Sequence, residues 1–134
     1  MPSLEFEELE PGVHKMIILK GKSVAERVET PWCQQTIDRI IDTHFPGCDQ
    51  GWTAVSLMVP GRSVAPHTDR ADAATKRVHV PLIEDTDCMF ITDDGAEHSM
   101  ARGRAYVIDP SIPHSVEHRG ARDRIHLIFN VRGN

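Results

Sequence analysis

The chain has 134 residues, of which 40% are hydrophobic and 26% are charged, and its formal net charge at pH 7 is −5. This length suits one compact domain, and this composition excludes a disordered chain. The negative charge disfavours a protein that binds nucleic acid by general attraction to phosphates, and no stretch approaches the ~18 apolar residues of a membrane helix.

The first part of the chain, residues 1–50, is expected to form one strand and one helix. The strand is predicted at 13–20, which is rich in β-branched and apolar residues. The helix is predicted at 31–45, because Pro31 fits the first helical position. The apolar residues of this helix fall on one stripe, which should be buried: Cys33, Ile37, Ile40, Ile41 and Phe45.

From residue 51 onward the sequence changes to short β-like segments separated by turn-forming residues. These segments are 52–59, 63–69, 76–83, 87–92, 97–101, 104–109, 114–119 and 124–131. Short strands at such regular spacing are typical of an antiparallel sandwich or barrel. We therefore expect a single mainly β domain over 1–134, with a jelly roll in 51–134 behind an N-terminal helical layer in 1–50.

Two of the predicted strands, 76–83 and 124–131, alternate between apolar and polar residues, so each has one polar face. The polar residues include Arg77 and His79 in the first strand, and Arg124 and His126 in the second. A polar face normally meets water. The alternative is a barrel whose apolar outer face is covered by the helix and whose interior holds a polar site.

A motif of two potential metal ligands, His67 and Asp69, stands two residues apart on one face of an extended segment. His114, which opens a later predicted strand, is the natural third ligand. Two histidines and one carboxylate leave sites of an octahedral ion open, as a non-haem Fe(II) oxygenase requires to bind a co-substrate and O₂. A structural zinc site would instead be closed by four ligands.

Cationic side chains accompany this motif at spacings that suit a dicarboxylate co-substrate. Arg124 lies ten residues after His114 and shares a strand face with His126. Its planar guanidinium could meet a remote carboxylate inside the barrel. Arg77 and His79 add a second cationic pair, and Ser56 adds a hydroxyl on the strand that precedes the motif.

The sequence at this point resembles the aspartyl/asparaginyl β-hydroxylases, which are iron- and 2-oxoglutarate-dependent dioxygenases with a cupin-like double-stranded β-helix. The matching stretches are 56–61 (SLMVPG), 65–68 (APHT), 77–79 (RVH) with Leu82, 108–111 (IDPS) with His114, and 124–129 (RIHLIF). The order and the intervals agree over roughly 52–131.

The resemblance implies a role for each matching polar residue. His67 and His114 resemble iron ligands. Ser56 and Arg124 resemble the partners of the distal 2-oxoglutarate carboxylate, and Arg77 and His79 resemble groups around its iron-chelating end. Animal members have glycine where this chain has Asp69, so the carboxylate here points to the three-ligand centre of the wider oxygenase superfamily.

The implied reaction hydroxylates an unactivated C–H bond with release of succinate and CO₂. The resemblance favours Cβ of aspartate or asparagine, free or in a peptide, as the target. Four arginines could meet a substrate carboxylate, and the sequence does not rank them: Arg62, Arg70, Arg102 and Arg104.

Two other functions remain open from the residues alone. One is a cupin-type metalloenzyme that does not use 2-oxoglutarate, and the other is a non-catalytic jelly-roll module that binds a small carboxylate. In each case we expect a small-molecule or peptidyl partner and neither nucleic acid nor a membrane. Three cysteines without CxxC spacing indicate free thiols, and no basic start with an apolar run marks a signal peptide, so we expect the cytoplasm.

Overall fold

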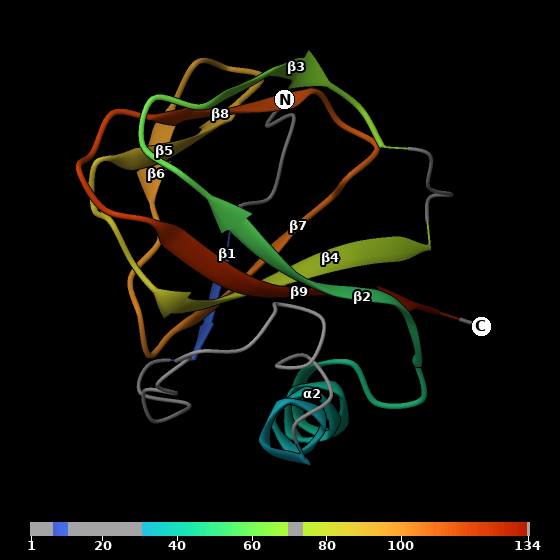
Figure 1. The fold of residues 1–134 in the computed structure, drawn as a ribbon. Helices are drawn as coiled ribbons and strands as arrows, with labels where there is room; N and C mark the ends of the chain where they lie inside the picture. Colours follow the sequence, from blue (N-terminus) through green and yellow to red (C-terminus); the bar gives the residue numbers. More distant parts are fainter. Residues whose placement is uncertain (1–6, 11–30, 70–73, 134) are drawn as a thin grey trace.

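The computed structural model describes residues 7–10, 31–69 and 74–133 (Figure 1). Its elements in chain order are β1 (Glu7–Glu10), α2 (Pro31–His44), β2 (Asp49–Met58), β3 (Ser63–His67), β4 (Thr75–Ile83), β5 (Cys88–Thr92), β6 (Glu97–Ser99), β7 (Ala105–Ile108), β8 (His114–His118) and β9 (Arg124–Arg132). The strand expected at 13–20 lies outside the described residues.

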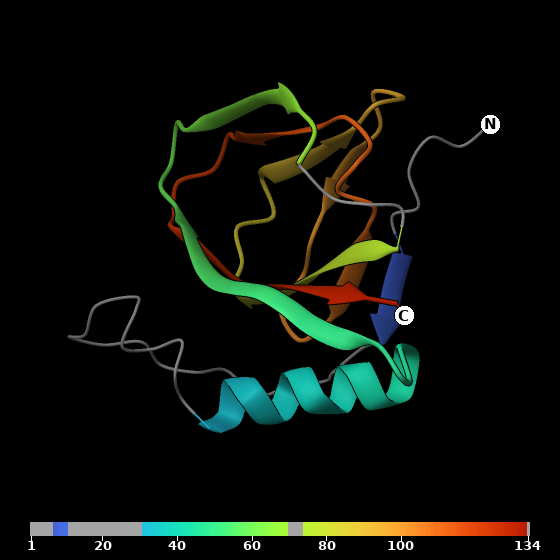
Figure 2. The ribbon, with the colours of Figure 1, turned by 90° about the vertical axis from the view of Figure 1, so that its right-hand side faces the viewer.

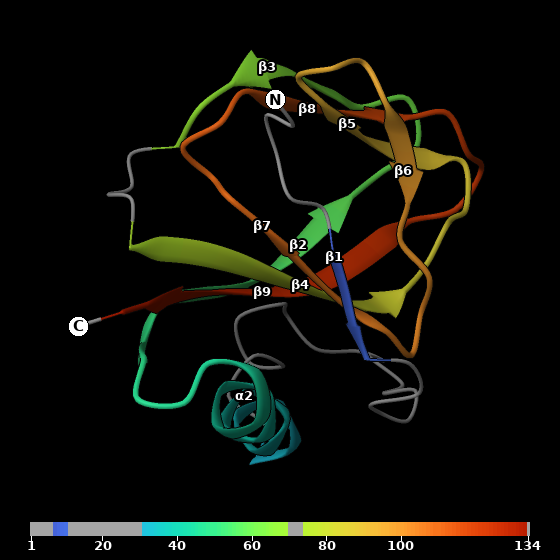
Figure 3. The same ribbon diagram turned by 180° about the vertical axis from the view of Figure 1, so that it is seen from behind.

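The strands form two antiparallel sheets. The larger sheet has the order β1-β7-β4-β9-β2, and the smaller one has the order β3-β8-β5-β6. Figures 1 and 3 show the two sheets facing each other, with the chain passing from β2 in the larger sheet to β3 in the smaller one. The expected mainly β jelly roll with a flanking helix is therefore confirmed, and each predicted strand after residue 51 has a counterpart.

The helix α2 covers the outer face of the larger sheet (Figure 2). Its buried stripe, which includes Ile37 and Ile40, joins one apolar cluster with Val78 of β4 and Phe129 of β9. Pro46 ends the helix because it cannot continue the backbone hydrogen-bond pattern. Gly47 then adopts a φ of 82°, which a residue without a side chain takes at little cost.

This arrangement shows which way the polar and apolar faces of β4 and β9 point. Val78 and Leu127 face the helix side and are fully buried. Their polar neighbours face the interior between the sheets, where a second apolar cluster around Phe90 and Tyr106 lines part of the space. The barrel with a covered outer face and a polar interior is therefore the observed one.

The short strand β1 was not expected, because its sequence EELE has no β-like alternation. It pairs antiparallel with β7 at the edge of the larger sheet, with Glu7 opposite Val107. Such a strand is specified by a partner distant in sequence, so local composition does not reveal it.

Candidate active site

The two histidines of the predicted ligand set are brought together by strand pairing. His67 closes β3 and His114 opens β8, and the two residues are partners in the β3–β8 ladder. Asp69 follows β3 and donates its backbone N–H to the carbonyl of Pro110 at 2.9 Å. One ligand atom from each of His67, Asp69 and His114 lies within 4.8 Å of the other two.

Both imidazole rings are oriented by backbone carbonyls. Nδ1 of His67 donates to the carbonyl of Ala65, and Nδ1 of His114 donates to that of Ile112, each at 2.8 Å. A carbonyl can only accept, so the proton sits on Nδ1 and the Nε2 lone pair is available for a metal. Nε2 lies 3.7 Å from Asp69 Oδ1 in His67 and 3.3 Å from Asp69 Oδ2 in His114.

The burial of the three groups differs in a way that suits an accessible centre. His114 is buried and stacks on Phe90 at a centroid distance of 5.4 Å. The side chains of His67 and Asp69 keep 36% and 27% of their surface exposed. Among the described residues the cluster has only three members, so a metal held here would keep open positions. Two imidazole nitrogens and a carboxylate oxygen are the donor set that fits Fe(II).

Arg77 reaches this cluster from β4 in the other sheet. Its Nη1 lies 2.5 Å from Asp69 Oδ2, and its Nε donates to Asn130 Oδ1 at 2.9 Å. The guanidinium also lies over the ring of Trp52, with Cζ 5.0 Å from the ring centroid. The resemblance predicted that Arg77 lies near the iron-chelating end of 2-oxoglutarate. In the structure, the carboxylate that Arg77 contacts is that of Asp69.

Arg124 and Ser56 meet on the neighbouring strands β9 and β2. Nη2 of Arg124 donates to Ser56 Oγ at 3.1 Å. Arg124 is 5% exposed, and its buried Nε has no hydrogen-bond partner among the described residues. Burial lowers the pKa of Arg124, and no described carboxylate pairs with it. A buried cation with unused donors fits an anionic ligand such as the carboxylate of a dicarboxylic acid.

His79 lies beside Arg124 and contacts His126, with the two Nδ1 atoms 3.1 Å apart. Burial, and then the charge of Arg124, hold the pKa of each ring well below its ordinary value. Both rings are therefore neutral near pH 7, and one Nδ1 donates to the other.

Apart from His126 and Asn130, the side chains described above line one pocket of about 170 Å³. Its lining comprises Trp52, Ser56, Met58, Val64, His67, Asp69, Arg77, His79, Phe90, His114, Val116, Arg124 and Ile128. All seven residues predicted for metal and co-substrate are in this lining. The structure thus collects these seven side chains from five strands and one loop around a single space between the sheets.

The arginines considered for substrate binding lie elsewhere. Arg62 lines a separate hollow on the turn between β2 and β3, and this hollow shares Met58 and Val64 with the pocket. Arg102 and Arg104 are exposed beside β7 and do not line the pocket. Arg70 lies outside the described residues.

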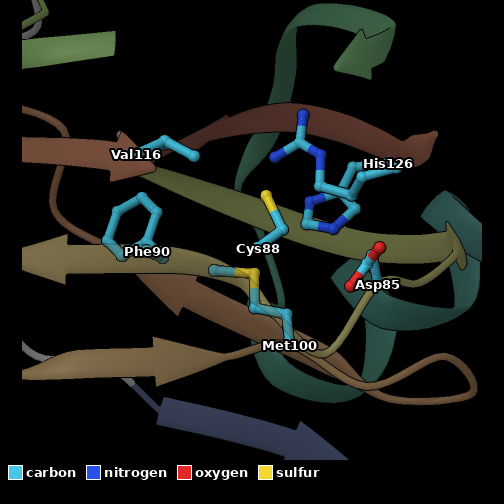
Figure 4. A pocket seen from close by; sticks show the side chains of 7 residues that line it. Asp85, Cys88, Phe90, Met100, Val116 and His126 are labelled. Carbon is cyan, nitrogen blue, oxygen red and sulfur yellow. The ribbon is translucent and has the colours of Figure 1, made fainter. Parts of the chain in front are cut away.

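A second, much smaller cavity of about 10 Å³ is lined by Asp85, Cys88, Phe90, Met100, Val116, Arg124 and His126. Figure 4 shows the side chains of Cys88, Met100 and His126 turned toward this space. It has room for about one water molecule. Because Arg124, Phe90 and Val116 also line the larger pocket, the small cavity lies directly behind its wall.

Three residues of the site were missed in the sequence. Trp52 and Asn130 both contact Arg77, and Phe90 packs on His114. Their types alone give no functional signal, since an aromatic residue in a strand is ordinary core. The alternation of β9 places Asn130 on the same strand face as Arg124. This shared face was the only feature of the sequence that pointed to a role for Asn130 in the site.

The fold and this cluster define a jelly-roll protein with a centre of two histidines and one carboxylate. A model of the aspartyl/asparaginyl β-hydroxylase family matches residues 9–133. The chain therefore belongs to that family, and the predicted class, an oxidoreductase that hydroxylates, is confirmed.

Several solved structures share the fold. A prolyl-4-hydroxylase from Pseudomonas putida is 22% identical, with a TM-score of 0.57 over 79% of this chain and 68% of that chain. A viral collagen prolyl hydroxylase from Paramecium bursaria Chlorella virus-1, solved as a complex with 2OG, is 13% identical, with a TM-score of 0.57 over 98% of this chain and 80% of that chain. A non-heme monooxygenase is 14% identical, with a TM-score of 0.61. The match covers 84% of this chain and 62% of the monooxygenase chain.

In the part of the chain that the structure describes, no helix is long and apolar enough to cross a membrane.

Proposed function

We propose that this chain is an Fe(II)- and 2-oxoglutarate-dependent hydroxylase. One observation carries the proposal: two groups line the same pocket. The first is an open cluster of three metal-ligating side chains, and the second is a buried arginine that no described carboxylate neutralises. The first is what Fe(II) requires, and the second is what the far carboxylate of a dicarboxylic acid requires. The 2OG complex of the viral hydroxylase with this fold supports the choice of co-substrate.

The residues have separable tasks in this proposal. His67, Asp69 and His114 would hold Fe(II), and Arg124 with Ser56 would bind the distal carboxylate of 2-oxoglutarate. His79, neutral because of its burial, lines the pocket between these two groups. When bound, Fe(II) supplies the redox chemistry by which O₂ converts 2-oxoglutarate to succinate and CO₂ and places a hydroxyl group on the substrate.

The protein's own contribution is geometric. Carbonyls fix the histidine rings, and the apolar side chains of Phe90, Val116 and Ile128 keep water away from one side of the pocket. A fixed, partly dry pocket holds the co-substrate and the target C–H bond in one orientation. No side chain here needs to act as an acid or a base.

We take the substrate to be an aspartyl or asparaginyl residue, free or in a peptide, with hydroxylation at Cβ. The family match supports this choice. The three cysteines, all within the described residues, are thiols outside any disulfide, which suits a reducing compartment, so we place the reaction in the cytoplasm.

The test is anaerobic addition of Fe(II) and then 2-oxoglutarate to the purified protein, followed by visible absorption. We expect a weak metal-to-ligand charge-transfer band that is lost in His67→Ala. Arg124→Met should need about 10–100 times more 2-oxoglutarate, since a charge-assisted hydrogen bond contributes roughly 1.5–3 kcal/mol. Arg119→Met, which removes an exposed arginine paired with Glu97 and Glu117, is the matched control.

Each outcome assigns the function. A band followed by succinate release with aspartyl or asparaginyl compounds in air supports the whole proposal. Metal binding without a band at any 2-oxoglutarate concentration would overturn it in favour of a cupin-type enzyme. Binding of 2-oxoglutarate without metal would favour the carboxylate-binding module.

A further inference from the structure

The Asp69 carboxylate is contacted from both sheets. Its oxygens face Nε2 of His67 and of His114, which belong to β3 and β8 of the smaller sheet. The shortest contact, however, comes from Arg77 on β4 of the larger sheet, at 2.5 Å to Oδ2. This ion pair joins the loop after β3 to the larger sheet, and both of its residues line the pocket.

Strand pairing does not fix the direction of the Asp69 side chain. The strand β3 ends at His67, and within the described residues the backbone of Asp69 makes one hydrogen bond, from its N–H to the carbonyl of Pro110. A carboxylate in such a stretch can adopt several rotamers, and ordering it costs conformational entropy. Something else must therefore hold it beside the two imidazoles.

Arg77, by contrast, is fixed at three points. It lies within β4, opposite Asn130 of β9 in the ladder, and its Nε donates to the side chain of that residue. Trp52 covers the guanidinium plane. Because Nε is used by Asn130, the geometry of the guanidinium directs Nη1 to Asp69.

We propose that Arg77 is a positioning residue that holds Asp69 in place as the third metal ligand, and that Asn130 and Trp52 set the orientation of Arg77. This inference rests on the proposed function, because it takes the cluster to be the metal site. It changes the expected role of Arg77, whose charge is here balanced by a carboxylate of the chain itself. Arg124 is left as the cation available to the co-substrate.

The test is the affinity for Ni(II) alone, measured by calorimetry without 2-oxoglutarate. Ni(II) binds imidazole more tightly than Fe(II) does, so weakened sites remain measurable. Arg77→Met should weaken Ni(II) binding about 10–100-fold, the usual loss when a partner that orients a metal ligand is removed. Asn130→Leu should produce a smaller loss in the same direction, and Arg119→Met should produce none.

Two further variants separate positioning from charge and from general structure. Arg77→Lys keeps the charge but cannot contact Asn130 and Asp69 together, so it should not restore affinity. In an Asp69→Gly background, Arg77→Met should have no further effect on Ni(II) binding, because the group on which Arg77 acts is gone. Thermal unfolding in EDTA checks that every variant is folded.

The possible failures are distinguishable. If the unmodified protein binds no Ni(II), the proposed function falls. If it binds Ni(II) and Arg77→Met or Arg77→Lys binds equally well, the positioning role is wrong and the proposed function stands. If the loss caused by Arg77→Met persists in the Asp69→Gly background, Arg77 acts by another route and the inference is overturned.

Discussion

Ser56 and Arg124 form a hydrogen bond between adjacent strands, with Ser56 Oγ accepting from Nη2 at 3.1 Å. The β2–β9 ladder sets this contact, because it pairs Ser56 with His126 and Met58 with Arg124. The hydroxyl thus holds one side of a guanidinium whose other donors are left for a ligand. The register of β2 and β9 therefore sets the position of the arginine.

This relationship predicts a graded effect on co-substrate use. Ser56→Ala removes one neutral partner of Arg124, so the KM for 2-oxoglutarate should rise about 3–10-fold. Arg124→Met removes the charge and should raise it by about 10–100-fold or more. Succinate formation at varied 2-oxoglutarate measures both, and equal KM values in the two variants and the unmodified protein would contradict the assignment.

Metal removal predicts a change in stability that does not require turnover. A ligand that binds only the folded state stabilises it by RT ln(1 + [L]/Kd), about 2.7 kcal/mol at a hundredfold excess over Kd. Ni(II) should therefore raise the midpoint of thermal unfolding by several degrees relative to EDTA. His114→Ala should abolish this shift, and a shift that survives in His114→Ala would place the metal elsewhere.

The sequence predicted most of the strands and the composition of the pocket because these depend on local signals. The alternation in β4 and β9 marks which side chains face inward, and the spacing of His67, Asp69 and His114 marks a ligand set. The ion pair of Arg77 with Asp69 could not be predicted in the same way. It joins the loop after β3 to the larger sheet, and its geometry depends on how far apart the sheets lie and on Asn130 and Trp52.

The carboxylate of Asp85 anchors the loop before β9, and the local sequence does not reveal this role. Asp85 follows β4 and is buried, and its carboxylate accepts from the backbone N–H groups of Asp87, Ala121 and Arg122. These hydrogen bonds lower the pKa of Asp85, and the one from the backbone of Arg122 has the largest effect. The charged run 84–87 (EDTD) looks like a solvated turn, yet Asp85 connects this turn to the loop that leads into Arg124.

Gly120 in that loop should not tolerate a side chain. A Cβ built on it would lie 2.1 Å from Asp85 Oδ2, and the carboxylate cannot move away without losing its hydrogen bonds to the loop. Gly120→Ala should lower the midpoint of thermal unfolding by roughly 5 °C or more. Gly133→Ala, where a Cβ would meet nothing within 4 Å, is the control; an equal effect of the two substitutions would show that the clash is absent.

The buried pair of His79 and His126 predicts how stability depends on pH. Burial holds the pKa of both imidazoles in the folded protein well below the unfolded value of about 6.5. The unfolded chain therefore binds more protons than the folded chain once the pH falls below about 6.5, and the free energy of unfolding decreases there. The decrease approaches about 1.4 kcal/mol per pH unit for each histidine.

Denaturant unfolding between pH 8 and pH 5 measures this slope above the range in which carboxylates titrate. His126→Gln replaces one imidazole by an amide that takes up no proton, so its free energy of unfolding should fall less steeply below pH 6.5 than that of the unmodified protein. The absolute stability of the variant can be lower at every pH, since a buried hydrogen bond to His79 is altered. Only the slope tests the idea, and an unchanged slope in His126→Gln would mean that this ring already binds a proton in the folded state.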